Sequence, residues 1–228
     1  MSRITVSPDV HGRNYWKQIN PNSCDMMIFL GDYVDSFDIS DDDIINNLLD
    51  IIQFKKDNDN KVVLLLGNHD QTYLYLNDGN YRCSGFREDI AYTLYDILYL
   101  NQKLFLNSYQ IDDTIFTHAG IQDNWFKERF KGDALQLEYS VAEQLNMPLN
   151  ERQIDALHQV GNLRGGMRGD IGGIFWCDKT ELKKPLQGFM QVVGHTHVSE
   201  PMKYTYKGAE VWFTDCHRNN IKFLTLEL

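Results

Sequence analysis

The segment that decides the fold runs from residue 26 to residue 70 and reads MMIFLGDYVDSFDISDDDIINNLLDIIQFKKDNDNKVVLLLGNHD. It contains two short apolar runs, Met26–Leu30 and Val62–Leu66, and a glycine follows each run directly. Such runs are typical of strands that are buried on both faces. Between them, Asp41–Lys56 has apolar residues at helical spacing, at Ile44, Ile45, Leu48, Leu49 and Ile52. The segment therefore predicts two strands joined by a helix in one βαβ unit.

The start of this helix carries its own signals. Ser40 precedes it and Asp43 follows three residues later, which is the spacing of a capping box. The acidic run Asp41–Asp43 suits the positive end of a helix dipole. We therefore expect this run to serve the helix and not a ligand.

Further elements follow on both sides of this unit. The expected strands are Ile4–Ser7, Thr114–Thr117, Phe189–Val193, Glu210–Thr214 and Lys222–Leu226. The expected helices are Arg87–Leu100, Asp133–Leu145 and Glu151–Gln159. A length of 228 residues suits one domain with a sizeable core. We expect a single domain over 1–228, with 122–185 inserted at the substrate side, over one end of the sheet.

Composition narrows the class of protein. The formal net charge of −10 argues against a general nucleic-acid binder, because phosphate backbones demand a basic surface. No apolar run is long enough to span a membrane, and the first residues lack a secretory signal. The four scattered cysteines suit reduced thiols. We therefore expect a cytoplasmic protein without a membrane partner.

Polar motifs stand at the ends of five apolar runs. The blocks are Asp9-Val10-His11-Gly12, Gly31-Asp32-Tyr33-Val34-Asp35, Gly67-Asn68-His69-Asp70, His118-Ala119-Gly120 and Gly194-His195-Thr196-His197. A single block would be a weak signal, because lone histidines and aspartates are more often structural. Five blocks of metal-binding residue types, each after a strand, favour a functional site. Outside them, we expect structural roles for His158 and His217. Asp70, at the end of the third block, suits either a helix cap or the chemistry.

The residue types in these blocks fit a pair of metal ions. Such a pair needs ligands that clamp two cations about 3.5–4 Å apart. Asp9 and His11 are two residues apart, so an extended chain directs both to one side. His195 and His197 have the same spacing, and the carboxylate of Asp32 has two oxygens with which to bridge two ions. The other candidate ligands are Asn68 and His118.

The order and content of the blocks resemble the calcineurin-like metallophosphoesterase superfamily over essentially the whole chain. The resemblance implies an α/β fold, a four-layer α/β/β/α sandwich of two mixed sheets with flanking helices. It implies two divalent ions, Mn, Fe or Zn, with Mn expected in vitro. One ion would be held by Asp9, His11, Asp32 and His197, and the other by Asp32, Asn68, His118 and His195.

The same resemblance implies a mechanism. A hydroxide that bridges the two metals would attack phosphorus in line. His69 would protonate the leaving oxygen, and Asp35 would hold His69 in orientation. A carboxylate behind a catalytic imidazole also meets a general chemical need.

Within the superfamily, the second and fourth blocks resemble a branch that includes serine/threonine phosphoprotein phosphatases and bacterial diadenosine tetraphosphatases. The chain departs from the phosphoprotein phosphatases at Ser36, where they carry an arginine that grips phosphate, and at His197, which they usually lack. Arg164 or Arg168, in the glycine-rich loop 161–173, could supply the missing guanidinium. Both arginines could equally face solvent.

We predict a metal-dependent phosphatase that hydrolyses a phosphomonoester of a small molecule, nucleotide or phosphoprotein. The alternative is a dinucleoside polyphosphate hydrolase acting on diadenosine tetraphosphate. Trp125 or Trp176 would then stack on adenine, although such aromatics are more often core residues. A phosphodiesterase is less expected because of the His-Ala-Gly block and the acidic charge. A non-catalytic scaffold is disfavoured, since every expected ligand and His69 are intact.

Overall fold

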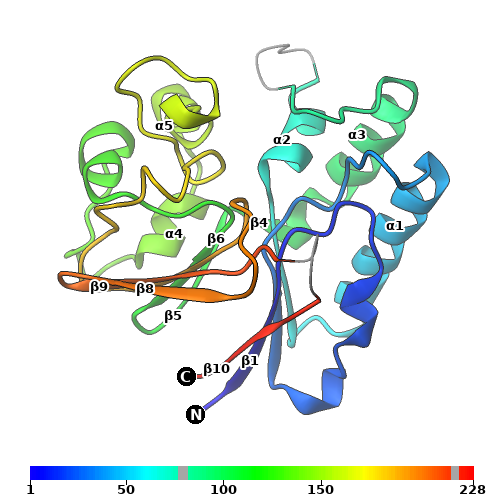
Figure 1. Cartoon of the computed structure of the whole chain (residues 1–228), viewed down its shortest axis with the longest axis horizontal. Helices are drawn as coiled ribbons and strands as arrows, with labels where there is room; N and C mark the ends of the chain where they lie inside the picture. The colour runs from blue at the N-terminus through cyan, green and yellow to red at the C-terminus, as the bar shows by residue number, and fades with distance from the viewer. Residues whose placement is uncertain (77–81, 217–220) are drawn as a thin grey trace. The chain divides into compact units, whose positions relative to one another are not determined.

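The computed structural model describes residues 1–76, 82–216 and 221–228. The chain divides into two compact units: unit 1 is Met1–Leu106 with Phe223–Leu228, and unit 2 is Asn107–Lys222. Within the described residues, each unit has its own five-stranded mixed sheet and its own helices (Figure 1). The prediction of an α/β protein with two mixed sheets and flanking helices is confirmed.

The sheet of unit 1 has the strand order β10-β1-β2-β3-β4. Strands β1 to β4 run parallel to their neighbours, and β10 pairs with β1 in the antiparallel sense. The strands are β1 (Arg3–Ser7), β2 (Met26–Phe29), β3 (Val62–Leu65), β4 (Phe105–Leu106) and β10 (Leu224–Glu227). The predicted strands at the N-terminus and in the βαβ unit are confirmed, and β10 begins two residues later than we expected.

Three helices of unit 1 lie together on one side of its sheet (Figure 1). They are α1 (Asp41–Asp57), α2 (Asn68–Leu74) and α3 (Ala91–Leu100). The predicted cap of α1 is confirmed, because the hydroxyl of Ser40 accepts the Asp43 amide at 3.2 Å. Of the residues predicted to form its apolar face, Ile44, Leu48 and Ile52 are buried, whereas Ile45 is half-buried and Leu49 is exposed.

The sheet of unit 2 has the strand order β5-β6-β7-β9-β8. Strands β6, β7 and β9 are parallel, while β5 and β8 pair with them at the edges in the antiparallel sense. The strands are β5 (Ser108–Ile111), β6 (Thr114–Thr117), β7 (Met190–Val193), β8 (Met202–Tyr206) and β9 (Ala209–Phe213). The central strands match the prediction, and the two edge strands were not predicted.

Helices α4 (Val141–Asn146) and α5 (Glu151–Leu157) lie on the same side of the unit 2 sheet (Figure 1). The prediction of a helix over Asp133–Leu145 is wrong in its first half, since α4 begins only at Val141. Ser140 and Glu143 form the capping box that sets this start: the Ser140 hydroxyl accepts the Glu143 amide, and the Glu143 carboxylate accepts the Ser140 amide at 2.7 Å.

The parallel strands bring the predicted motifs to common sheet edges. In unit 1, β1, β2 and β3 end just before the blocks that start at Asp9, Gly31 and Gly67. In unit 2, β6 and β7 end just before His118 and Gly194. Ligands of open α/β sheets bind at these carboxyl ends. Among the residues that the structure describes, no helix has both the length and the apolar character needed to cross a membrane.

Two glycines let the loops after β2 and β3 touch. Gly31 has a φ of +102°, and a Cβ added there would lie 2.3 Å from the backbone nitrogen of Gly67. A Cβ added at Gly67 would lie 2.2 Å from Oδ1 of Asp32. Both positions therefore exclude a side chain, and the two loops that carry predicted site residues are in backbone contact.

Candidate metal centre

Backbone hydrogen bonds join the loops after β1 and β2. The carbonyl of Asp32 accepts the amides of Val10 and His11, at 3.0 and 2.7 Å. His11, Asp32 and Asp35 adopt the left-handed conformation, with φ of 48°, 52° and 63°. That conformation costs a non-glycine residue about 1–2 kcal/mol. Such strain persists where surrounding structure over-determines it, and it clusters at functional sites.

Asp70 holds the loops after β2 and β3 together. Its Oδ2 accepts the amides of Asp32 and Gly67, each at 2.8 Å, and its Oδ1 accepts the Tyr33 amide at 2.9 Å. Asp70 is fully buried. Of the two roles that the sequence left open for Asp70, these contacts favour the cap, and the same carboxylate also anchors the neighbouring loop.

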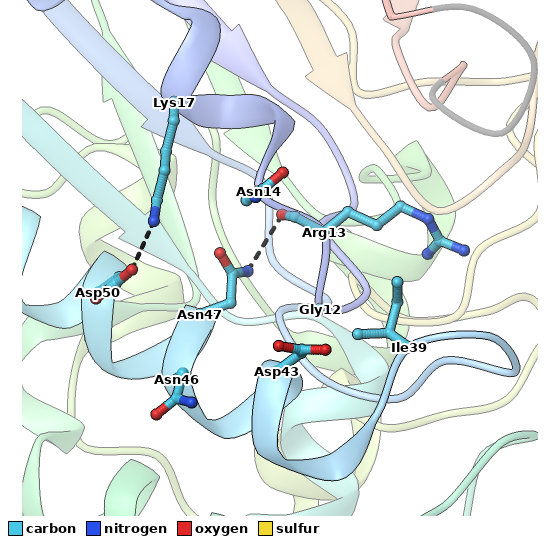
Figure 2. A pocket seen from close by; sticks show the side chains of 9 residues that line it. All are labelled: Gly12, Arg13, Asn14, Lys17, Ile39, Asp43, Asn46, Asn47 and Asp50. Carbon is cyan, nitrogen blue, oxygen red and sulfur yellow. Dashed lines mark hydrogen bonds and ion pairs between the residues drawn. The ribbon is translucent and has the colours of Figure 1, made fainter.

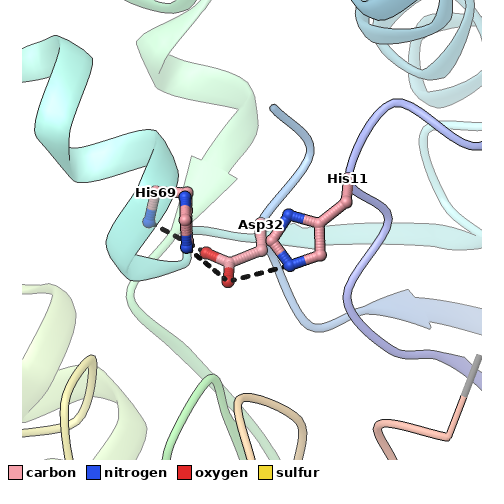
Figure 3. Close-up of side chains that lie close together, drawn as sticks. All are labelled: His11, Asp32 and His69. Atoms are coloured by element: carbon pink, nitrogen blue, oxygen red, sulfur yellow. Dashed lines mark hydrogen bonds and ion pairs between the residues drawn. The ribbon is translucent and has the colours of Figure 1, made fainter. Parts of the chain in front are cut away.

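The imidazole of His11 is oriented by the main chain. Its Nδ1 lies 3.1 Å from the carbonyl of Val34 and 3.0 Å from that of Asp35. Carbonyl oxygens only accept, so Nδ1 carries the proton and Nε2 presents a lone pair. That Nε2 faces Oδ2 of Asp32 at 3.8 Å (Figure 3). Burial, together with the neighbouring His69, lowers the pKa of His11 to about 4, so the ring is neutral at pH 7.

Asp32 presents one carboxylate oxygen to two imidazoles. Its Oδ1 accepts the amide of His69 at 2.9 Å, and its Oδ2 lies 3.8 Å from Nε2 of His11 and 4.0 Å from Nε2 of His69 (Figure 3). Burial raises the pKa of Asp32 well above its usual range, although the charge of His69 opposes the shift. A divalent cation would reverse this penalty. A buried carboxylate beside a neutral imidazole lone pair is a donor set that fits Mn, Fe or Zn.

His69 and Asp35 form a close pair. Nδ1 of His69 lies 2.7 Å from Oδ2 of Asp35, which is buried. Burial alone would lower the pKa of His69, but the charge of Asp32 and the hydrogen bond to Asp35 raise it above its ordinary value. The nitrogen and oxygen atoms of His11, Asp32 and His69 also lie within 4.8 Å of one another. Geometry therefore allows His69 either to donate a proton or to bind a metal.

The remaining candidates of unit 1 lie beside this group. Asp9 is buried, and its charge acts on both His11 and Asp32. Asn68 is also buried, and its amide nitrogen lies 3.2 Å from Sγ of Cys83. That contact engages the nitrogen end of the amide, so a metal would meet the oxygen end.

In unit 2, the structure brings His118 and His195 together. Nε2 of His118 lies 3.1 Å from Nδ1 of His195, and their rings meet at 65° with centroids 4.9 Å apart. The amide of Gly194 donates to the His118 carbonyl at 2.8 Å, which joins the loops after β6 and β7. His195 has a φ of 59°, a left-handed conformation like those in unit 1. Two imidazole nitrogens this close can bind one cation.

His197 has a carboxylate neighbour that our sequence analysis did not include in the site. Nδ1 of His197 lies 3.9 Å from Oδ2 of Asp215, and the amide of Val198 donates to the Asp215 carbonyl at 2.7 Å. Asp215 follows β9 as Asp9 follows β1, and that position is the signal that could have found it. Carboxylates behind metal-binding histidines commonly fix their orientation. His217 lies outside the described residues.

Arg164 is tied to the loop that carries His195 and His197. Its Nη2 donates to the hydroxyl of Thr196 at 2.9 Å, and its Nε lies 3.1 Å from Oδ2 of Asp178. Thr196 stands between the two histidines. Arg168, the other predicted arginine, is exposed.

The two tryptophans differ in burial. Trp125 is 1% exposed, stacks on Phe130 and donates its Nε1 to the carbonyl of Ala156, so it is a core residue. Trp176 is partly exposed, and its ring centroid lies 6.1 Å from that of His195. Only Trp176 therefore has both surface and position for contact with a substrate. His158 is buried, as its expected structural role requires.

Unit 1 also contains a polar pocket of about 340 Å³ between the loop after His11 and helix α1 (Figure 2). Lys17 and Asp50 form an ion pair at 2.6 Å on its wall, and the Asn47 amide donates to the Arg13 carbonyl at 3.2 Å. Its lining residues are Gly12, Arg13, Asn14, Lys17, Ile39, Asp43, Asn46, Asn47 and Asp50. Most of these side chains are polar or charged.

Comparisons with known proteins bear on the family and the fold of this chain. The profile of a family described as calcineurin-like phosphoesterase matches residues 3–199. The structure of a cold-active protein-tyrosine phosphatase from a psychrophilic Shewanella species is 19% identical, with a TM-score of 0.60 over 100% of this chain and 76% of that one. A protein serine/threonine phosphatase from Saccharomyces cerevisiae, with similarity to human phosphatase PP5, is 16% identical, with a TM-score of 0.54 over 94% and 67%. At these identities the two structures show a shared fold. Among curated proteins, none matches this sequence significantly.

The role of Asp70 predicts the effect of replacing it. An amide in Asp70→Asn offers only one accepting oxygen, so at least one of the three backbone amides loses its acceptor. We expect the free energy of unfolding, measured by urea denaturation, to fall by about 1–3 kcal/mol. Asp50→Asn is the control, because its exposed ion pair with Lys17 is worth about 1 kcal/mol or less. Equal losses in both variants would contradict the anchoring role.

Proposed function

The chain belongs to the calcineurin-like phosphoesterase family, and from that premise we propose that it hydrolyses phosphomonoesters with two divalent cations. As a member of this family it is a metal-dependent phosphoester hydrolase. The observation that carries the proposal is that two pairs of side chains in unit 1 suit two different roles, metal binding and proton donation. Nε2 of His11 and Oδ2 of Asp32 present lone pairs to each other, while Nδ1 of His69 is bound to Asp35.

The proposed metal ligands come from both units. They are Asp9, His11, Asp32 and Asn68 of unit 1, and His118, His195 and His197 of unit 2. When bound, Mn, Fe or Zn would supply Lewis acidity toward phosphate oxygens and toward attacking water. The tautomer and neutral state of His11 and the burial of Asp32 support this assignment.

His69 would act on the leaving group. As the bond between phosphorus and the leaving oxygen breaks, its electron pair goes to that oxygen, and Nε2 of His69 supplies the proton that completes the alcohol. Asp35 holds the opposite N–H and so keeps the ring in one orientation. The raised pKa of His69 supports this role, because a general acid must carry its proton before the reaction.

Arg164 is the better of the two arginine candidates for binding phosphate. Its contact with Thr196 fixes it beside His195 and His197, and Asp178 holds its Nε. A guanidinium can bind two phosphate oxygens at once. Arg168 is exposed on the same glycine-rich loop and has no comparable contact among those described.

A dinucleoside polyphosphate such as diadenosine tetraphosphate is the alternative substrate. The observation that favours it is the position of Trp176, partly exposed and beside His195. An indole in this place could stack on a base.

The metal assignment predicts a stoichiometry. Protein reconstituted with saturating Mn or Zn should hold two divalent cations per chain by elemental analysis. Asp32→Asn should reduce the binding of both ions, because its carboxylate is the proposed bridge. Asp9→Asn should strongly weaken the binding of only one ion. A wild-type protein that binds one ion or none under these conditions would rule out the dinuclear proposal.

The role of His69 predicts a dependence on the leaving group. His69→Ala should keep its metal content and lose roughly 10²–10⁴-fold in kcat on an ester with a poor leaving group, such as phenyl phosphate. The loss should be much smaller on p-nitrophenyl phosphate, whose leaving oxygen needs little protonation. Loss of a metal in this variant would instead identify His69 as a ligand, which its distance from Asp32 allows.

Substrate class can be tested with the Mn-loaded protein on phosphopeptides, p-nitrophenyl phosphate, bis-p-nitrophenyl phosphate, cyclic nucleotides and diadenosine tetraphosphate. We expect turnover of the monoesters and little turnover of the diesters. Arg164→Ala should raise KM for every ester that is hydrolysed, by more than the comparison variant Arg168→Ala does. Trp176→Ala should harm only diadenosine tetraphosphate hydrolysis if the indole stacks on adenine. Preferential hydrolysis of the dinucleotide would replace the monoester proposal with the alternative.

A further inference from the structure

Helix α2 carries a tyrosine one helical turn after His69. Tyr73 is four residues further along, so both side chains lie on one face of the helix. We propose that Tyr73 is a positioning residue, which fixes the carboxylate of Asp35 so that His69 is held for proton transfer. This inference rests on the proposed function of His69 as the proton donor.

The two residues of α2 engage both oxygens of Asp35. The Tyr73 hydroxyl donates to Oδ1, and Nδ1 of His69 lies 2.7 Å from Oδ2. A carboxylate bound at one oxygen can rotate about its bond to Cβ. A carboxylate bound at both oxygens by groups on one helix cannot rotate without breaking a contact. The plane of the carboxylate, and with it the direction of the bond to His69, is therefore set by Tyr73.

The direction of the tyrosine hydrogen bond is also determined. The backbone amide of Arg87 donates to the Tyr73 hydroxyl oxygen at 2.9 Å. A phenol has one proton, and an amide cannot accept it, so that proton points to Asp35. Burial raises the pKa of Tyr73, and the charge of Asp35 raises it further, so the phenol stays a donor.

The tyrosine itself is rigidly held. Its side chain is fully buried, and its ring stacks on Phe86 with centroids 5.0 Å apart and planes 16° apart. The guanidinium of Arg87 binds the carbonyls of Ser36 and Ile39, the latter at 2.9 Å. The segment that follows Asp35 is thus tied to the same residue that orients the Tyr73 hydroxyl.

Asp35 needs this support because it orients two imidazoles. Its carbonyl accepts Nδ1 of His11 at 3.0 Å, and its carboxylate holds Nδ1 of His69. It does so in the left-handed conformation, which is strained for a residue with a side chain. In the proposed reaction the proton leaves from Nε2 of His69 to the departing oxygen, and no proton passes to Asp35 or Tyr73.

The test is Tyr73→Phe, which removes the hydroxyl and keeps the ring on Phe86. We expect kcat on phenyl phosphate to fall roughly tenfold, the lower end of the cost of losing an outer hydrogen bond. KM and metal content should stay unchanged, and p-nitrophenyl phosphate hydrolysis should fall much less. In a His69→Ala background the same substitution should have no further effect, because the two residues act as one unit.

Tyr33→Phe is the matched control. It also removes a buried tyrosine hydroxyl, one that donates to the Leu65 carbonyl at 2.8 Å and makes no bond to Asp35 or His69. The control should not alter the ratio of kcat between the two substrates. Equal fractional losses on both substrates in Tyr73→Phe, or full additivity with His69→Ala, would overturn the positioning role.

A spectroscopic measurement separates this inference from the proposed function. The proton on Nδ1 of His69 should give a low-field resonance in the proton NMR spectrum, assigned by its loss in His69→Ala. That resonance should shift in Tyr73→Phe and stay in place in Tyr33→Phe. If the resonance does not move in Tyr73→Phe, the coupling between Tyr73 and His69 is refuted, whatever catalytic activity this variant has. If the wild-type protein hydrolyses no phosphate ester but the resonance shifts, the proposed function fails while the contact stands.

Discussion

The site of unit 1 depends on one buried carboxylate that satisfies three backbone amides. Asp70 accepts from Asp32, Tyr33 and Gly67, so it fixes the ends of β2 and β3 against each other. A carboxyl group can accept hydrogen bonds at both of its oxygens, so one side chain can hold a strained loop closed. The left-handed turn at Asp32 is stable under this constraint. Asp70 thereby determines where the lone pairs of the neighbouring loop point.

Three of the buried carboxylates in unit 1 are held in three different ways, and the difference marks Asp32 as the proposed metal ligand. Asp70 is held by backbone amides, and Asp35 by a tyrosine hydroxyl and an imidazole. Oδ1 of Asp32 accepts the His69 amide, and its Oδ2 faces the unprotonated Nε2 of His11. Two lone pairs that face each other in a buried place favour a cation between them. The partners of a buried carboxylate, and not its burial, therefore distinguish a candidate metal ligand from a structural group.

Local signals allowed much of this to be predicted from the sequence. Apolar runs located the central strands, and Ser40 located the start of α1, because those signals lie within a few residues of their effect. The start of α4 was missed because helical spacing was given more weight than the cap at Ser140. Tyr73 was missed for another reason: it acts on Asp35, which is distant in the sequence, and only the fold brings the two together. Asp215 was missed although it follows β9 as Asp9 follows β1, since its contact with His197 is seen only in the fold.

Ser36 shows how this chain uses the position where phosphoprotein phosphatases carry a phosphate-gripping arginine. Its hydroxyl donates to Asp38 at 2.8 Å and its carbonyl binds Arg87, so the residue closes its own loop. Arg87 is committed to that loop through Asp41 as well, and Arg13 is committed to Asp38. Guanidinium groups held by carboxylates and carbonyls have fewer donors for a phosphate. Arg13 and Arg87 therefore have fewer N–H groups left for a phosphate than their charge alone would suggest.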